Sequence, residues 1–298
     1  MIKAVAFYVL FIPIVFPASS QSGKADQDKD AFRNWINDNI SVRRAFDGSR
    51  QESLPAALHF MLDFEERKNN SFNVDAGIKL IEIQPFRNAE LVMYPSVEWH
   101  KQLRNGDPKD PRSFNNWSAN INMEFAVFDV RKYLISPTFV GSTTYKNNIK
   151  EETEEFKTSL LATFFSNREW LPGAWIRKDG AIPRFRYYPY AGYEHFSPLN
   201  TDSSDGLSYF LIRFSSEYYP VATIERQIIQ VTFNYVHRFK INDIEALSSP
   251  FIINAGVNWY LTRKENLALS INYVNGRSPS SDYIYNHQLT FGLSYSMN

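Results

Sequence analysis

The sequence contains no cysteine, which excludes disulfide scaffolds, cysteine-ligated zinc, iron–sulfur clusters and thiol nucleophiles. It also lacks a charge excess of either sign, because 32 Lys and Arg balance 32 Asp and Glu. Proteins that bind nucleic acid neutralise phosphates with a basic excess or a basic stripe, so nucleic acid is not the expected partner. The mean hydropathy of −0.37 excludes a bundle of transmembrane helices. No long apolar run follows residue 20, so any membrane insertion must use strands.

The first 20 residues have the order of a secretory signal peptide. Lys3 precedes an apolar run from Ala4 to Phe16, and the small residues Ala18 and Ser20 suit cleavage before Gln21. An apolar run of this length is too short for a membrane anchor, since about 20 residues are needed to span a bilayer. A lipoprotein is excluded because there is no cysteine to acylate. We therefore predict a cleaved signal peptide at residues 1–20.

Residues 21–54 form a second, polar segment. Its first part, Gln21–Asp30, has the composition of a disordered stretch. Apolar residues then recur at helical spacing, which predicts one short amphipathic helix containing Phe32, Trp35, Ile36 and Ile40. Such a helix could plug a pore, lie on a membrane surface or pack against the rest of the protein.

The remaining residues, 55–298, alternate between apolar and polar with a period of two. In one run Leu267, Leu269 and Ile271 oppose Ser270 and Asn272. Successive side chains of a strand point to opposite faces, so each run has one apolar and one polar side. About twelve runs follow this pattern, and they start near residues 57, 72, 91, 118, 133, 157, 184, 207, 226, 250, 266 and 287. Many reach the length of roughly 9–11 residues that a tilted strand needs to cross a bilayer.

The two faces of these runs differ in a way that favours a membrane barrel. One face is rich in Phe, Leu, Ile and Val, with Tyr and Trp toward the run ends, as interfacial girdles require. The other carries Asp, Glu, Lys, Arg and Asn, which a soluble core would tolerate only in pairs. We predict an all-β, antiparallel up-and-down transmembrane barrel of about 12 strands over residues 55–298, with a periplasmic soluble β-sandwich as the alternative.

Connection lengths agree with both chain ends lying in the periplasm. The longer outer loops are then 102–117, 147–156, 196–206, 240–249 and 276–285, and the turns at 130–132 and 263–265 are short. Residues 167–183 are too long for a periplasmic turn. Either a strand is misplaced there or this turn carries its own structure.

The signal peptide, the even set of alternating runs and the closing run from Leu289 to Tyr295 resemble the outer-membrane β-barrel proteins of Gram-negative bacteria. The chain departs from that class at its end, which is Asn298 rather than an aromatic residue. The resemblance implies an outer-membrane location after signal cleavage. It implies outer-membrane lipids and the barrel-assembly machinery as partners.

Charged residues on the inward face are candidates for the lumen lining. Alternation places Arg184, Arg186 and Glu194 on one side of a single strand, and Arg213 and Glu124 point inward from other strands. Opposed rows of charge could form a narrow solute channel with a transverse field. The same residues could equally form a closed, salt-bridged plug, as in barrels of this width. Both possibilities stay open.

His195 and Ser197 stand two residues apart, so on a strand their side chains share a face. A hydroxyl becomes a useful nucleophile when an adjacent imidazole takes its proton. Because Tyr193 is on the lipid side, His195 and Ser197 are expected on that side too, at the outer end of a strand. A third group on the following strand would orient the imidazole, and that position falls on Ser208 or, by strict spacing, on Tyr209.

This local pattern resembles the active-site strand of the outer-membrane phospholipase A family. The resemblance implies His195 as base, Ser197 as nucleophile, Ser208 in the orienting position and calcium as a cofactor. That family uses Asn in the orienting position, and its usual Ser-Asn-Gly is here Ser197-Pro198-Leu199. The glycine-rich Asn-Tyr-Glu-Pro stretch expected upstream is absent as well.

A loop with several oxygen-bearing side chains follows, and Asp202 and Asp205 are its candidate calcium ligands. An Asx-rich segment that ends in Gly206 is also an ordinary turn sequence. Taken together, the sequence favours a non-enzymatic solute channel or surface barrel. The alternative is a calcium-assisted acyl hydrolase on the lipid-facing wall.

Overall fold

The structure, a computed structural model, describes one compact unit within Asn37–Asn298. The described residues are 40–43, 46, 48–49, 52, 56–63, 70–84, 90–104, 107, 109–110, 113–128, 133–174, 176–178, 181–199, 206–222, 227–241, 250–262, 267–277 and 285–295. The predicted signal peptide, and the predicted amphipathic helix up to residue 39, lie outside them. Among the described residues no helix is long and apolar enough to cross a membrane.

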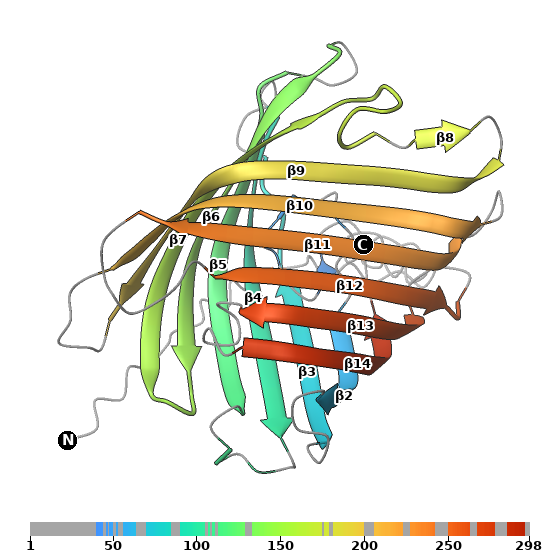
Figure 1. Cartoon of the computed structure of the whole chain (residues 1–298). Coiled ribbons are helices and arrows are strands. Elements are labelled where there is room, and N and C mark those ends of the chain that lie inside the picture. Colours follow the sequence, from blue (N-terminus) through green and yellow to red (C-terminus); the bar gives the residue numbers. More distant parts are fainter. Residues whose placement is uncertain are drawn as a thin grey trace, which may run out of the picture. The chain divides into compact units, whose positions relative to one another are not determined.

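Twelve long antiparallel strands form a closed barrel (Figure 1). The strands of the described chain are β1 (Ser41–Arg43), β2 (Ala56–Asp63), β3 (Asn70–Lys79), β4 (Glu90–Arg104), β5 (Phe114–Ala126), β6 (Ser136–Asn148), β7 (Thr153–Phe165), β8 (Ile176–Lys178), β9 (Ala181–Pro198), β10 (Leu207–Ala222), β11 (Gln227–Lys240), β12 (Phe251–Tyr260), β13 (Leu267–Arg277) and β14 (Tyr285–Tyr295). The barrel omits the short strands β1 and β8. It closes where β14 pairs with β2, from Tyr295 opposite Ala56 to Gln288 opposite Asp63. The predicted fold class is confirmed.

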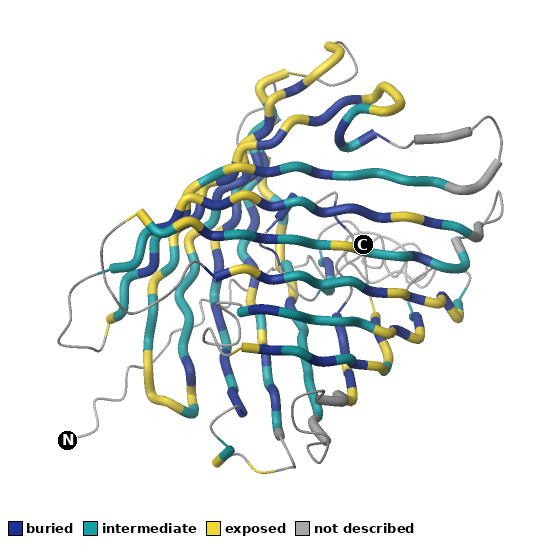
Figure 2. The backbone as a smooth tube through the Cα atoms, in the orientation of Figure 1, coloured by how far each residue is buried: buried dark blue, intermediate teal, exposed yellow. Residues whose placement is uncertain are grey.

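The alternation of the sequence becomes an alternation of burial along the strands (Figure 2). On β5, Asn116, Ser118 and Asn120 face inward and are buried, whereas Ile121 is 60% exposed on the outside. Large apolar side chains cover the outer wall and polar side chains fill the interior, which is the reverse of a soluble protein. The core of this molecule is therefore mostly a network of polar side chains inside the barrel.

Several connections differ in length or content from the expectation. The turn predicted at 130–132 is a longer connection, 127–135, and the outer loop predicted at 102–117 is shortened to 105–113 because β4 and β5 extend into it. The predicted outer loop 147–156 is a four-residue turn over 149–152, and Glu152 adopts a positive φ of 55° there. Its flanking strands pair to their ends, with Asn148 opposite Thr153. The polar residues 147–148 and 153–156, which were expected in the loop, therefore belong to strands.

The long connection before β9 carries its own structure, which was one of the two alternatives. It contains β8, which pairs antiparallel with the first part of β9. The turn ahead of β8 docks on the same strand, because the Gly173 backbone amide donates to the Tyr187 carbonyl and the Tyr187 hydroxyl donates to the Trp170 carbonyl. The extension of β9 beyond its neighbour β7 is thereby paired.

Phe46, Ser49 and Glu52, together with Gly48, contact side chains that face the interior from opposite sides of the barrel. Upstream of them β1 pairs with β3, Ser41 opposite Lys79, so the chain enters beside the start of β2. The Phe46 amide donates to Glu98 and the Ser49 hydroxyl donates to Glu124. We call Phe46, Gly48, Ser49 and Glu52 the crossing segment.

Candidate functional site

His195 and Ser197 lie at the end of β9, on the outer face of the wall. They share that face with Ala191 and Tyr193, which are exposed, whereas Glu194 points into the barrel and is buried. Ser208 is the second residue of the neighbouring strand β10 and stands directly opposite His195 in the register. Alternation places His195 and Ser197 on one face of β9, and the β9–β10 register brings Ser208 to the same surface.

These three side chains form a continuous hydrogen-bonded set, which we call the Ser–His–Ser site. Ser197 Oγ lies 2.9 Å from His195 Nε2, and His195 Nδ1 lies 2.9 Å from Ser208 Oγ. Both bonds are satisfied when the ring carries its proton on Nδ1, because Nε2 then accepts from the Ser197 hydroxyl. This is the arrangement of nucleophile, base and orienting group that acyl transfer requires.

Tyr193 extends the set by one further hydroxyl. Its oxygen lies 2.9 Å from Ser208 Oγ. A hydroxyl carries one hydrogen and can accept two bonds, so Ser208 can accept from His195 and donate to Tyr193 at once. Tyr209, the other candidate for the orienting position, is fully buried on the inward face and lies away from the imidazole.

Gly206 provides the space that the imidazole occupies. A Cβ atom at this position would lie 2.6 Å from His195 Cε1 and 2.8 Å from His195 Nε2. These distances are too short for any side chain, and the carbonyl of Phe196, 2.8 Å away, blocks the other direction. The glycine that looked like the end of a turn is thus a requirement of close packing against the base.

The surroundings of the Ser–His–Ser site are apolar on the side of the barrel middle. Leu160, Phe210 and Ile212 are each more than 40% exposed on the outer face. On β7, Thr158 stands opposite His195 and Phe156 opposite Ser197. The site therefore lies at the border between an apolar wall and the connection that follows β9.

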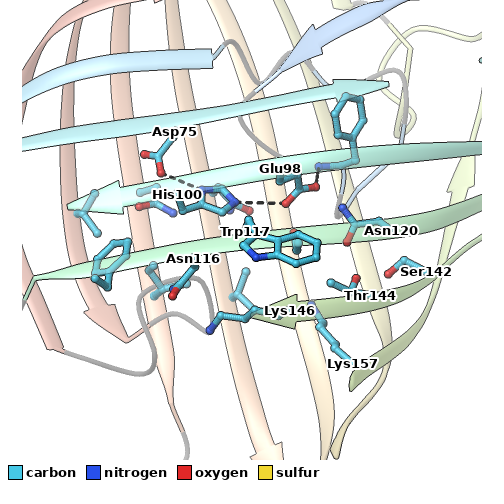
Figure 3. A pocket seen from close by; sticks show the side chains of 18 of the residues that line it. Asp75, Glu98, His100, Asn116, Trp117, Asn120, Ser142, Thr144, Lys146 and Lys157 are labelled. Atoms are coloured by element: carbon cyan, nitrogen blue, oxygen red, sulfur yellow. Dashed lines mark hydrogen bonds and ion pairs between the residues drawn. The ribbon is translucent and has the colours of Figure 1, made fainter. Parts of the chain in front are cut away.

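Inside the barrel, a cavity of about 220 Å³ opens between inward-facing polar side chains (Figure 3). His100 links two carboxylates in its wall, with Nδ1 2.9 Å from Asp75 Oδ1 and Nε2 3.2 Å from Glu98 Oε2. Lys146 and Lys157 lie on the other side of the cavity, with Asn116 between the two groups. Phe46 of the crossing segment lines the cavity too.

The predicted lumen residues lie inside the barrel, most of them in ion pairs or hydrogen bonds. Glu194 pairs with Lys157 at 2.8 Å and with Arg238 at 2.6 Å. Arg213 pairs with Glu52 of the crossing segment at 2.7 Å, with both side chains almost fully buried. Glu124 accepts from Ser49, Arg186 pairs with Glu217, and Arg184 is half-buried at the start of the inward row of β9.

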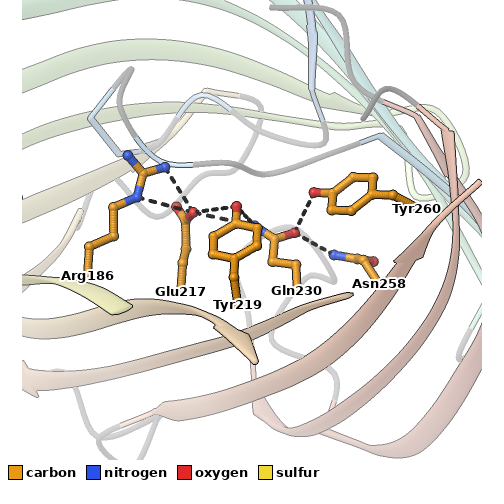
Figure 4. A network of polar contacts seen from close by, with 6 residues as sticks. All are labelled: Arg186, Glu217, Tyr219, Gln230, Asn258 and Tyr260. Carbon is orange, nitrogen blue, oxygen red and sulfur yellow. Dashed lines mark hydrogen bonds and ion pairs between the residues drawn. The ribbon is translucent and has the colours of Figure 1, made fainter. Parts of the chain in front are cut away.

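A second polar network occupies the barrel between β9 and β12 (Figure 4). Arg186 donates to Glu217, which also accepts from the Tyr219 hydroxyl. Gln230 then donates to Tyr219 and accepts from Tyr260 at 2.8 Å each. These contacts join four strands across the interior and satisfy groups that would be costly to bury alone.

Several partners in these networks had not been singled out from the sequence. Lys157, Glu217 and Arg238 follow the same alternation as the predicted lumen residues, so parity alone could have identified them. Glu52 had no such signal, because the crossing segment has no period of two. The sequence pattern assigns Tyr193 only to the lipid-facing side of its strand. Its position two residues before His195 puts its hydroxyl on the same face as the imidazole, which could have indicated a contact with this site.

The proposed calcium ligands Asp202 and Asp205 lie outside the described residues. Within the described part of the chain, no group of three or more His, Asp or Glu side chains is arranged to hold a metal ion.

Comparisons with known proteins concern the fold alone. No known protein family matches the sequence. No curated protein matches it either. Among solved structures, the β domain of the Bordetella autotransporter BrkA is 11% identical with a TM-score of 0.40, covering 86% of this chain and 98% of that one. A bacterial polysaccharide outer membrane secretin is 7% identical with a TM-score of 0.44, covering 88% and 100%. These comparisons do not show the resemblance to outer-membrane phospholipase A that the sequence suggested.

Proposed function

We propose that this chain is an outer-membrane acyl hydrolase that cleaves lipid esters at the outer leaflet. The observation that carries the proposal is the continuous contact Ser197–His195–Ser208 on the outer face of the barrel. An imidazole pointing into the interior would have argued against an enzyme, and the side chain points outward.

The depth of the Ser–His–Ser site fits a lipid ester. From Phe185 to His195 the outer face of β9 extends about 34 Å at about 3.4 Å per residue. With the strand tilt of about 45° typical of membrane barrels, this is a height of about 25 Å, the thickness of their apolar band. Ester bonds of membrane lipids lie where the acyl chains end, so a height of about 25 Å at His195 supports a lipid ester as the substrate.

The chemistry follows from the hydrogen bonds. The Ser197 hydroxyl attacks the ester carbonyl while its proton passes to His195 Nε2, and the imidazolium then protonates the leaving alcohol. A water molecule attacks the acyl-serine in the second step, with His195 again taking and returning the proton. Ser208 accepts from Nδ1–H throughout and keeps Nε2 directed at the nucleophile.

The direct test is release of fatty acid from phospholipid–detergent micelles by refolded protein, with and without calcium. Ser197→Ala removes the nucleophile, so activity should fall by at least a thousandfold. Ser216→Ala, on the outer-face register of β10, is the matched control and should retain activity. Folded wild type that releases no fatty acid under either condition contradicts the proposal, as does a fully active Ser197→Ala variant.

The second candidate is the solute channel that the sequence favoured. The polar cavity of about 220 Å³ supports it, because it offers solutes a hydrated entrance. The crossing segment stands against a through-going path, since it is held to Glu98, Glu124 and Arg213. The geometry therefore favours the hydrolase.

A further inference from the structure

The cavity inside the barrel is lined by charged and by neutral polar side chains, and the hydrolase chemistry uses neither kind. It lies at the same end of the barrel as the Ser–His–Ser site, since its lining includes Lys157, which stands opposite Phe196 in the register. Phe46 lines it as well, and so does Arg213, which pairs with Glu52. The cavity is therefore bordered by the crossing segment.

The charged side chains of this cavity have partners of opposite charge. The pairs are Lys157 and Arg238 with Glu194, at 2.8 Å and 2.6 Å, Arg213 with Glu52 at 2.7 Å, His100 with Asp75 and Glu98 at 2.9 Å and 3.2 Å, and Lys146 opposite Glu155 in the register. A charged ligand would have to compete with these pairs, and breaking a buried pair leaves one charge uncompensated. The ligand that suits this cavity is therefore uncharged.

Neutral polar side chains form one wall of the cavity, on β5 and β6. In the register Asn120 stands opposite Thr144, and Asn122 stands opposite Ser142. Figure 3 shows three of them, Asn120, Ser142 and Thr144, beside the cavity. From the spacing of facing residues and of alternate residues along a strand, these four side chains cover a patch of about 5 Å by 7 Å. We call these four residues the amide–hydroxyl wall.

The amide–hydroxyl wall has hydrogen-bonding capacity left for a ligand. The side-chain amides of Asn120 and Asn122 both donate to Ser96 Oγ, at 3.2 Å and 2.8 Å, and their carbonyl oxygens can accept further bonds. The hydroxyls of Ser142 and Thr144 form no hydrogen bond within the described part of the chain. The wall thus presents carbonyl acceptors beside hydroxyls that can both donate and accept.

Apolar side chains line another part of the cavity. Val236 on β11 and Ile252 on β12 stand opposite each other in the register, and both line the cavity although the neighbouring interior is mostly polar. A ligand whose hydroxyl groups surround a carbon framework can accept such neighbours, because its carbon-bound hydrogens need no hydrogen bonds.

We propose that this cavity binds a neutral, polyhydroxylated molecule of the size of one hexose. Each sugar hydroxyl donates one hydrogen bond and can accept two, which matches the acceptors and hydroxyls of the wall. A pyranose ring is about as broad as the amide–hydroxyl wall, so adjacent hydroxyls of one ring can reach both strands. The cavity volume of about 220 Å³ lies below the usual range of about 300–1,000 Å³ for drug-sized ligands, which favours one ring over a chain of sugars.

The experiment is isothermal titration calorimetry of the full chain in micelles of a detergent without a sugar headgroup. The probes are glucose, galactose and mannose. We expect at least one of them to bind at least tenfold more tightly than glucuronate and glucosamine, which add a negative or a positive charge to the ring, and than tetrahydropyran, which lacks hydroxyls. The proposal is overturned if folded wild type binds none of the three hexoses, or binds the charged analogues as tightly.

Variants locate the binding surface. The double replacement Ser142→Ala and Thr144→Val removes both hydroxyls of the wall and should weaken hexose binding at least tenfold. Thr138→Val, on the same strand and the same inward face but outside the cavity lining, is the matched control and should change nothing. Unchanged affinity in the double variant contradicts the assignment of the wall.

Two further measurements keep the outcome clear. The heat-dependent gel mobility of folded barrels checks that each variant is folded. Ser197→Ala should bind the hexose as wild type does, so this proposal and the hydrolase stand or fail separately.

Discussion

Ser208 occupies the orienting position of the Ser–His–Ser site with a small, neutral hydroxyl group. Its hydroxyl accepts from His195 Nδ1 at 2.9 Å and has a second contact of the same length with Tyr193. A carboxylate in this place would stabilise the imidazolium electrostatically; a hydroxyl only fixes the tautomer and the ring orientation. The proposed enzyme should therefore depend on Ser208 less than on Ser197.

Replacement of Ser208 measures this dependence. Ser208→Ala removes the acceptor of one hydrogen bond, worth about 0.5–1.5 kcal/mol, so kcat should fall about twofold to thirteenfold with KM unchanged. Ser208→Asn offers a carbonyl acceptor and should restore activity to at least the wild-type level. Steady-state kinetics on a micellar substrate separates the two constants. An unchanged kcat in Ser208→Ala would remove Ser208 from the mechanism.

At the scale of elements, the junction before β10 decides whether His195 can keep its position. The chain returns from β9 through residues 199–206 and enters β10 at Leu207, and the last residue of this return packs against the imidazole edge. The precision of the site thus comes from two paired strands and one close backbone approach.

Gly206→Ala tests that approach. The added methyl group would lie 2.8 Å from His195 Nε2, so the ring must shift and its bond to Ser197 must break or lengthen. We expect fatty-acid release to fall at least tenfold while the barrel stays folded. Gly141→Ala on β6 is the matched control, because its new Cβ would meet the flexible end of Met123 at 3.3 Å and otherwise only ordinary contacts, with the Ser159 carbonyl at 3.7 Å and Leu160 at 3.9 Å. Equal activities of the two variants would contradict the packing argument.

At the scale of the whole molecule, the barrel closes around a polar interior that its own chain crosses. Glu52 is central to this crossing, since it accepts from Arg213 at 2.7 Å and from the Tyr190 hydroxyl at 2.6 Å. Removing one partner of a buried ion pair costs about 3–5 kcal/mol, because the other charge is left buried and uncompensated. The crossing segment is therefore the part of the interior whose release would open the barrel.

Glu52→Ala should release this segment and raise ion conductance across a planar bilayer above the low wild-type level. Glu82→Gln, which removes a more exposed ion pair with Lys79, is the control and should leave conductance unchanged, since such pairs contribute about 0–1 kcal/mol. A wild type that already conducts as strongly as Glu52→Ala would show that the crossing segment does not block the path.

The sequence by itself determined the strands and their two faces. All twelve runs became barrel strands, because a period of two sends every second side chain to the same side whatever the neighbours are. The same rule placed His195 and Ser197 on the outer face. It failed at residues 149–152, where a turn is far shorter than polar composition suggested, and at residues 167–183, where the length signalled structure without specifying β8.

Only the tertiary structure decided which residues meet. Ser208 rather than Tyr209 contacts His195 because the register of β9 and β10 sets them opposite, and register depends on pairing along the whole strand. Glu194 finds Lys157 and Arg238 on two other strands, and Glu52 finds Arg213 across the interior. Alternation assigns a side chain to a face; the closure and stagger of the barrel assign it a partner, because they fix the height at which each strand presents it.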